Sequence, residues 1–528
     1  MAATSASMVF YIFSWLSLVV LTSLLKYLIN KTRTNPRIQT PPSPPSLPII
    51  GHLHLIGSSV IPKSFQALAK LYGPLIQLRL GASTFILVSN AQVAKQVLKT
   101  NEINFINRPH IGSTSEYNLY EGCDFVFAPY GPYWRFMKKL CMNELLSSSQ
   151  LGRFMHVREQ EIKKLLKSLM ICSSEGRECD LGFELTTLTN NILCRTAMST
   201  TCVDKDKNSN DDAVEIHGLV KEFLELGAKF SIGDVLGPLG KLDLFGYGKR
   251  LLKTLTRFDQ IVERIMEEHE KKNDNEGETW DMMDVLLQVY RDPNAQVRLT
   301  RNHIKAFFRD IFLAGTDSSS VSVQWTMAEI LNHPTVLKRL RAEIDAVVGS
   351  TRLVNESDVP NLPYLQAVVK EAMRLHPTAP LSLREAASDF SINGYNVKSQ
   401  TRTIINIYAI MRDPEAWPNP EDFIPERFLD DTTNDGVYGD HYNLKERFIK
   451  MSVNDFRYIP FGFGKRGCPG ASLALTVINL TVAALIQCFD WRIKGADRVN
   501  MEEGSSFSMG LAQPLVCYPV TCFNPFSL

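Results

Sequence analysis

The sequence predicts an α-rich mixed α+β fold with a small β region. Thr300 is a good N-cap for a long segment of helical apolar periodicity that reaches about Leu331, just before Pro334. Residues 75–88 alternate between apolar and polar side chains around a Gly-Ala-Ser turn, which indicates a β-hairpin. No linker separates two independent patterns in the 528 residues, so one large domain is expected behind a short N-terminal segment.

The N-terminal segment predicts a membrane anchor over residues 1–30. Residues 8–25 form an uncharged apolar run of 18 residues, which is near the lower limit for crossing a bilayer. Basic residues follow this run and no charged side chain precedes it, so the positive-inside rule places the main domain in the cytosol. A cleaved signal peptide is the alternative. The absence of a basic n-region and of a clear small-x-small cleavage site favours the anchor.

Residues 31–50 read as a basic, proline-rich hinge, and residues 51–528 as the main domain. Five prolines between positions 41 and 48 make the hinge a stiff, extended spacer. The net charge of +1 argues against nucleic acid as a partner. Ten cysteines at irregular spacing, without a Cys-x-x-Cys motif, indicate reduced thiols in a cytosol-facing protein rather than a disulfide framework.

Residues 461–470 carry the strongest chemical signal. Four glycines among these ten residues let the backbone fold tightly around Cys468, and an apolar helical run follows from Ala471, with Pro469 suited to a first helical position. A cysteine just before a helix N-terminus lies near free N–H groups, so its thiolate is favoured. Such a thiolate can hold a metal, including haem iron. The alternative is a buried structural cysteine after a Gly-rich turn.

The spacing in this loop resembles the haem-binding loop of the cytochrome P-450 family, Phe-x-x-Gly-x-Arg-x-Cys-x-Gly, with matches at Phe461, Gly464, Arg466, Cys468 and Gly470. The resemblance extends over nearly all of the chain from Pro41 onward. It implies a cytochrome P-450 fold that binds haem b, with Cys468 as the proximal ligand of the iron. It also implies that Arg466 pairs with a haem propionate and that Phe461 and Gly462 contact the cofactor.

Three further residues match cofactor-binding positions of the family. Trp134 and Lys138 are four apart and share a helical face; the family usually has Trp-x-x-x-Arg here, donating to a propionate. Lys138 offers a point charge in place of the arginine fork. An exposed basic helix, with Arg135 and Lys139, is the alternative and could face an acidic reductase. Arg384 matches another propionate-binding arginine.

The segment Ala-Gly-Thr-Asp-Ser-Ser at residues 314–319 lies in the middle of the predicted long helix. Gly315 costs a helix about 1 kcal/mol relative to alanine, so it requires a reason. The segment resembles the oxygen-activation motif of the family, in which small residues admit O2. The resemblance implies that Asp317 is the relay acid and that Ser318 replaces the usual threonine hydroxyl, with Thr316 beside them. A kinked core helix with solvent-facing polar residues is the alternative.

Glu371 and Arg374 are three apart, so they share a helical face and can pair. They resemble the Glu-x-x-Arg pair of the family, which Arg427 in Pro-Glu-Arg-Phe would close into a buried structural triad. Segments that match substrate-contacting positions are rich in Phe, Leu, Ala, Met and Ser, which indicates a small apolar substrate. They are parts of 112–127, the 307–310 face, residues just before Arg384, and 505–511.

The resemblance implies a single-pass, membrane-anchored haem-thiolate monooxygenase at the cytosolic face of the endoplasmic reticulum. Its electrons would come from NADPH through NADPH-cytochrome P-450 reductase, since the chain has no Gly-x-Gly-x-x-Gly strand–helix unit of its own. The motifs are similar to the plant A-type microsomal group, especially its flavonoid- and triterpenoid-oxidising families.

Within this group we expect hydroxylation or successive oxidation of a triterpenoid or other terpenoid. A flavonoid oxidase, either hydroxylase or desaturase, is the close alternative, because fold and motifs do not determine the substrate. Two hypotheses come from other classes: a haem-thiolate isomerase or dehydratase that works without reductase, and a non-catalytic haem- or sterol-binding membrane protein.

Overall fold

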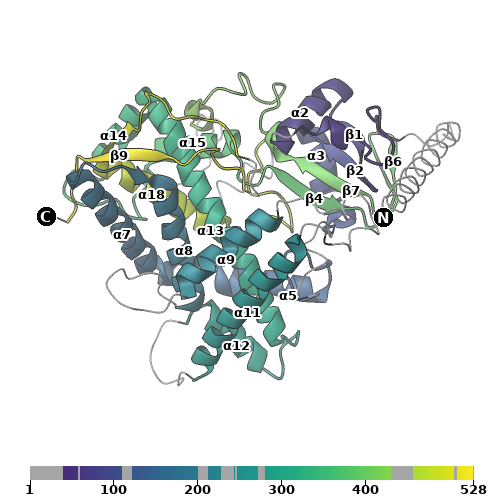
Figure 1. The fold of residues 1–528 in the computed structure, drawn as a ribbon, viewed down its shortest axis with the longest axis horizontal. Helices are drawn as coiled ribbons and strands as arrows, with labels where there is room; N and C mark the ends of the chain where they lie inside the picture. Colours follow the sequence, from purple (N-terminus) through teal and green to yellow (C-terminus); the bar gives the residue numbers. More distant parts are fainter. Residues whose placement is uncertain are drawn as a thin grey trace, which may run out of the picture.

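The computed structural model describes residues 40–57, 60–109, 120, 122–199, 212–227, 243, 246–271, 280–429, 456–504 and 508–526. The predicted anchor and residues 31–39 of the hinge lie outside the described residues, as do residues 112–119, 121 and 505–507 of the predicted substrate segments. The described part consists of a helix-rich body with a smaller β region at one side (Figure 1). The predicted α-rich mixed α+β fold is therefore confirmed.

The β region is built on a four-stranded sheet in the order β1-β2-β7-β4. Strands β1 (Leu75–Leu80) and β2 (Ser83–Val88) form the predicted antiparallel hairpin. β2 then pairs in parallel with β7 (Arg402–Asn406), and β7 pairs antiparallel with β4 (Leu381–Glu385). The residues before Arg384 therefore lie in the same sheet as the N-terminal hairpin, with β7 between them.

The remaining elements are mostly helices, with two small sheets of order β3-β9-β8 and β5-β6. The longer helices are α2 (Ile61–Tyr72), α5 (Pro132–Leu140), α7 (Met155–Ser174), α8 (Leu181–Met198), α9 (Asp212–Gly227), α11 (Tyr247–Lys271), α12 (Met282–Arg291), α13 (Arg301–Asn332), α14 (Pro334–Val347), α15 (Pro363–Leu375) and α18 (Ala471–Cys488). The short elements are α3 (Ala91–Lys95), α6 (Ser148–Arg153), α16 (Ile407–Ile410), β3 (Cys179–Asp180), β5 (Phe390–Ile392), β6 (Tyr395–Val397), β8 (Phe489–Ile493) and β9 (Val516–Thr521).

Helix α13 is the central element of the body and confirms the predicted long helix. Thr300 caps it, because its hydroxyl accepts a hydrogen bond from the backbone N–H of His303. Its 32 residues extend about 48 Å and end at Asn332, since Pro334 cannot continue the helix. It packs against α8, α15 and α18, so it can connect the distant parts of a site.

Helix α18 is apolar on nearly all sides. Among the described residues it is the one helix with the length and composition to cross a membrane, but most of it is buried inside the protein. Its buried side chains pack in the largest core cluster together with α13 and α15. We therefore interpret α18 as a core helix that carries the Cys468 loop at its N-terminus.

A buried histidine connects the end of α11 to the start of α12. The Nδ1 atom of His269 lies 2.8 Å from the carbonyl oxygen of Ile265, and its Nε2 lies 2.9 Å from Oδ2 of Asp281, which also caps α12. Both partners accept hydrogen bonds, so both ring nitrogens donate when the histidine is charged. Burial alone lowers the pKa of His269, but the hydrogen bond and charge of Asp281 outweigh it and raise the pKa.

The stability of the protein should therefore depend on the protonation of His269. A raised folded-state pKa means that this contribution is fully present below the unfolded value of about 6.5 and is lost as the pH rises through the folded value. His269→Gln should cost about 1.5–3 kcal/mol at pH 6 and much less at pH 8.5, as measured by denaturant unfolding. His156→Gln, at an exposed histidine, is the control. An equal cost of His269→Gln at both pH values would contradict the assignment.

Candidate active site

The loop of residues 461–470 folds back on itself ahead of α18. The backbone N–H of Cys468 donates to the carbonyl of Phe461 at 2.9 Å. Gly462 and Gly464 have φ of +68° and +71°, a left-handed conformation that favours glycine. A Cβ atom on Gly464 would also collide with Oε1 of Glu102, which accepts a hydrogen bond from the backbone N–H of Lys465. The backbone conformation therefore favours glycine at position 464, and a larger residue would also displace the Glu102 side chain that holds the loop.

Cys468 is an exposed residue, although protein surrounds its thiol closely. The residue is exposed, while burial of the thiol by surrounding protein raises its pKa. The exposure of the residue and the raised pKa of its thiol agree if Cys468 borders an internal cavity. The backbone N–H of Gly470 and two cations, Lys138 and Arg108, act in the opposite direction without reversing the shift. The helix N-terminus therefore lowers the pKa of the thiol, as the sequence suggests, but burial outweighs this effect. A metal ion held by Cys468 would supply the missing positive charge, since metal coordination favours the thiolate.

Buried cations gather around this loop in excess of the anions. Burial lowers the pKa of Arg108 and lowers that of Arg466 to about 9. It also holds the pKa of Arg384 well below its usual range, and the charges of Arg108 and Arg466 add to this effect. The Nε atom of Arg108 is buried and has no hydrogen-bond partner among the described residues. Such a group of desolvated cations fits a bound dianion, as the two propionates of haem b would provide.

Arg466 is held in place by backbone carbonyl groups. Its Nε donates to Ile106 at 2.9 Å, one Nη donates to Val126 at 3.2 Å, and the other donates to Ala128. The guanidinium lies 4.5 Å from the ring centroid of Trp134, a cation–π contact. The sequence therefore places Arg466 and Trp134 in one site correctly, and their contact with a propionate remains a prediction.

Lys138 and Arg384 also have protein partners. The ammonium of Lys138 donates to the carbonyl of Gly467 at 2.9 Å, so it stabilises the loop directly beside the cysteine. Arg384 donates to the hydroxyl of Ser382 and to the carbonyl of Leu383, each at 2.9 Å. Their proposed contact with propionates remains a prediction, and the geometry adds a structural role for Lys138 that the sequence did not indicate.

Residues 125–126 connect the cysteine loop to α13. The backbone N–H groups of Phe125 and Val126 donate to Oδ2 of Asp310 at 2.8 and 3.0 Å, while the carbonyl of Val126 accepts from Arg466. The ring of Phe125 lies 6.3 Å from that of Phe307. The predicted 307–310 face is thus occupied, in the described part, by packing and hydrogen bonding to residues 125–126.

The predicted oxygen-activation segment is helical and has one open face. Ala314 is exposed and Ser318 is partly exposed on a helix that is otherwise mostly buried at this depth. The Ser318 hydroxyl donates to the carbonyl of Ala314 at 2.7 Å. Thr316 is buried, and its hydroxyl has no partner among the described residues. Because two helical positions differ by about 200°, Thr316 lies on the face away from Ser318. Asp317 is partly exposed between them.

Gly315 has a packing reason. A Cβ atom at this position would lie 3.2 Å from Cδ2 of Leu193 on α8, closer than ordinary contacts allow. The glycine therefore lets α13 approach α8 closely, and the Thr189 hydroxyl of α8 donates to the carbonyl of Thr316 at 2.7 Å. The sequence identifies Gly315 as unusual and suggests that it admits O2, but in the structure Gly315 packs against α8.

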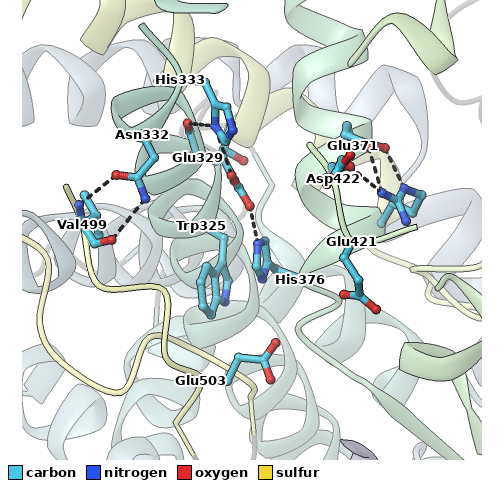
Figure 2. A network of polar contacts seen from close by, with 12 residues as sticks. Trp325, Glu329, Asn332, His333, Glu371, His376, Glu421, Asp422, Val499 and Glu503 are labelled. Atoms are coloured by element: carbon cyan, nitrogen blue, oxygen red, sulfur yellow. Dashed lines mark hydrogen bonds and ion pairs between the residues drawn. The ribbon is translucent and has the colours of Figure 1, made fainter. Parts of the chain in front are cut away.

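The structure brings Glu371, Arg374 and Arg427 together. Arg374 binds both carboxylate oxygens of Glu371 at 2.7 and 2.8 Å, and Nε of Arg427 lies 3.2 Å from Oε1. Glu371 and Arg374 are fully buried. The guanidinium of Arg374 also donates to the carbonyls of Met411, Pro420 and Asp422; Glu371 and Asp422 are labelled at the right of Figure 2. Each charged side chain of the triad is therefore hydrogen-bonded, which is what makes its burial tolerable.

Arg108 is the cofactor-site candidate that sequence reasoning missed. It lies in an irregular segment before Pro109, where no periodic pattern indicates which way a side chain points. Its burial and its proximity to Cys468 and Arg466 appear only in three dimensions. The only signal in the sequence is an arginine directly before a proline, and this pair is too common to indicate a cofactor contact.

An accessible cysteine ahead of a buried apolar helix, with unmatched buried cations around it, defines the site of a haem-thiolate protein. The cytochrome P-450 family model matches residues 41–518, and the chain belongs to the cytochrome P-450 family. It is therefore a haem monooxygenase whose iron receives electrons from a redox partner.

Relatives and solved structures agree with this family. The chain is 42% identical over 519 residues to a 3,9-dihydroxypterocarpan 6A-monooxygenase of Glycine max, covering 96% of this chain and 98% of the relative. It is 40% identical over 518 residues to a beta-amyrin 24-hydroxylase of Glycine max, covering 96% of each. A zebrafish cytochrome P-450 structure with progesterone has a TM-score of 0.72 at 26% identity, covering 87% of this chain and 99% of that one.

Proposed function

We propose that this enzyme oxidises a triterpenoid or related terpenoid, once or repeatedly at one carbon. Residues 1–30 would anchor it in the endoplasmic reticulum membrane, residues 31–50 would form the hinge, and the domain of residues 51–528 would face the cytosol. NADPH-cytochrome P-450 reductase would deliver the electrons. The similarity to a beta-amyrin hydroxylase supports a triterpenoid, and the similar identity to a pterocarpan monooxygenase keeps a flavonoid-type substrate as the second candidate.

The observation that carries the catalytic part of this proposal is the accessible thiol among unmatched buried cations. Cys468 would hold the iron of haem b, with Phe461 and Gly462 beside it. The propionates would be bound by the cations Arg108, Lys138, Arg384 and Arg466 and by the indole N–H of Trp134. When bound, the haem supplies the activation of O2 and the insertion of one oxygen atom into a C–H bond.

The chain's own contribution on α13 is the handling of protons. The Ser318 hydroxyl donates to Ala314 and retains an accepting lone pair, so it can receive a proton at Oγ as it gives one up. Asp317, the residue before Ser318, is partly exposed and can replenish this proton from solvent. The sequence places Thr316 beside these two residues, but its buried position on the opposite face favours a packing role.

Ser318→Ala should lower the yield of oxidised product per NADPH consumed by about tenfold or more, because the proton-carrying hydroxyl is lost. Ser318→Thr should retain most of the yield, since the hydroxyl remains and the added methyl only restricts its rotamer. Thr316→Val is the matched control on the buried face. NADPH consumption and product are measured in parallel. Equal yields from Ser318→Ala and the unmodified enzyme would contradict the proton role.

The function is tested by turnover in microsomes that contain a plant reductase. β-Amyrin and 3,9-dihydroxypterocarpan are supplied separately, and products are identified by mass spectrometry with and without NADPH. An oxygenated triterpenoid formed only with NADPH supports the proposal, while an oxygenated pterocarpan supports the second candidate. Product formed without NADPH would indicate the isomerase or dehydratase class. Spectral shifts without any product would indicate a binding protein. Cys468→Ser microsomes are the control.

A further inference from the structure

A buried trio of side chains, Trp325 and Glu329 from α13 and His376 from the end of α15, meets near the C-terminal end of α13 (Figure 2). The ring of His376, which follows α15, stacks on the indole of Trp325 with centroids 3.9 Å apart and an interplanar angle of 4°. Its Nε2 lies 2.7 Å from Oε1 of Glu329, one turn further along α13. All three side chains are buried. The trio therefore joins α13 to the chain that leaves α15.

The same trio reaches a third segment near the C-terminus. The indole Nε1 of Trp325 donates to the carbonyl of Met509 at 2.8 Å. The backbone N–H of Met509 donates to the carbonyl of Thr378 at 3.0 Å, and Thr378 comes two residues after His376. The contacts therefore close a ring through α13, residues 376–378 and Met509. Both backbone hydrogen-bonding groups of Met509 belong to this ring.

The segment fixed by this ring lies beside the open face of α13. A Cβ atom on Gly510 would lie 3.6 Å from the Val321 side chain, and Val321 comes three residues after Ser318. Three residues correspond to about 4.5 Å along a helix axis. The amide of Asn332 holds the start of the same C-terminal segment through both backbone groups of Val499, as Figure 2 shows. The hydrogen bonds of Met509 with Trp325 and Thr378 thus hold residues 508–511 against Val321, about one turn of α13 from Ser318.

The His376 imidazole is neutral in this setting. Its Nδ1 is buried and has no hydrogen-bond partner among the described residues, so a second N–H there would be unsatisfied. Burial lowers the pKa of His376 well below its usual value and raises that of Glu329 to about 7. One proton between Nε2 and Oε1 therefore satisfies the pair. The other charged or titratable groups that face the pair are Lys63, His333, Arg374, Arg412 and Glu503.

We propose that Trp325, Glu329 and His376 are positioning residues for substrate: they set the place of residues 508–511 against α13 and so shape one wall of the substrate site. The ring of contacts stands on the geometry alone. Its effect on substrate rests on the proposed function and on the expectation from the sequence that residues 505–511 contact the substrate. The two parts are tested by separate measurements.

Trp325→Phe is the sharpest variant, because it keeps an aromatic ring against His376 and removes the N–H that binds Met509. Hydrogen exchange of the haem-loaded protein should become about fivefold faster at amides of residues 508–511, which corresponds to about 1 kcal/mol for one lost hydrogen bond. Trp491→Phe is the matched control. Its indole nitrogen is also buried but has no hydrogen-bond partner among the described residues, so the same atoms are removed without breaking such a bond. His376→Gln tests the ring from its other side.

The second measurement uses two ligands of haem iron that differ in size. Imidazole and 4-phenylimidazole are titrated into each variant and followed by the shift of the Soret band. In Trp325→Phe the bulky ligand should bind about fivefold more weakly, with imidazole affinity and the carbon monoxide spectrum unchanged. Unchanged exchange at residues 508–511 would overturn the ring. Faster exchange with both ligands bound as before would overturn the positioning role. A failure of the haem-thiolate assignment would show separately, as an abnormal spectrum of the unmodified protein.

Discussion

Cys468→Ser should abolish the strongly red-shifted Soret band of the reduced carbon monoxide complex and lower monooxygenase activity to background. The reason is that the electron donation of a thiolate ligand to iron is lost when serine replaces it. The alcohol is also far less acidic than a thiol, so it does not provide an equivalent anion. The reduced spectrum under carbon monoxide and the haem content of the purified protein are the measurements.

Cys522→Ser is the matched control for this experiment. Cys522 is the other exposed cysteine in the described part of the chain, and its Sγ lies 3.4 Å from the carbonyl of Gln487. The same chemical change there should leave the spectrum intact. A folded, haem-loaded Cys468→Ser protein that kept the red-shifted band would refute Cys468 as the ligand.

Glu371→Gln is expected to have the second-largest effect, through stability. The neutral amide leaves Arg374 fully buried without its counter-charge, which costs about 3–5 kcal/mol. That is a large part of the total stability of a typical protein, about 5–15 kcal/mol. The variant should yield little haem-loaded protein and should unfold at a much lower denaturant concentration. Haem content and denaturant unfolding measure the two consequences.

Glu426→Gln is the control for the triad experiment, because it removes the same charge from an exposed ion pair. Glu426 pairs with Arg339 at 2.7 Å, with both side chains about half exposed. A surface pair of this kind contributes about 0–1 kcal/mol. If Glu371→Gln were no more destabilising than Glu426→Gln, the triad would not have the structural role assigned to it.

The elements that the sequence predicts well are those with a regular period or a fixed spacing. The cap at Thr300 and the apolar periodicity after it locate α13, and strict alternation locates the β1–β2 hairpin. The three-residue spacing of Glu371 and Arg374 predicts a shared helical face, and the structure shows the pair in contact. In each case the information is local, so a short stretch of sequence contains it.

The parts that the sequence predicts poorly depend on distant segments. Lys138 is on the helix face expected for a cofactor contact, but the acceptor over that face is the carbonyl of Gly467, 329 residues away. Gly315 looks like an opening for a ligand, whereas its neighbour is Leu193 on α8. Arg108 shows no pattern at all. Periodicity gives the direction of a side chain from its own helix and says nothing about what lies opposite.

The loop before α18 also has a consequence for biosynthesis. Its partners Glu102, Ile106 and Lys138 come from the first third of the chain, and the hydrogen bonds that join them to residues 465–467 span 329 to 363 residues. Contacts of such long range form late in folding. The ribosome must therefore synthesise nearly the whole polypeptide before the cofactor site can form. Cofactor insertion is accordingly a post-translational event, and truncated nascent chains should emerge without it.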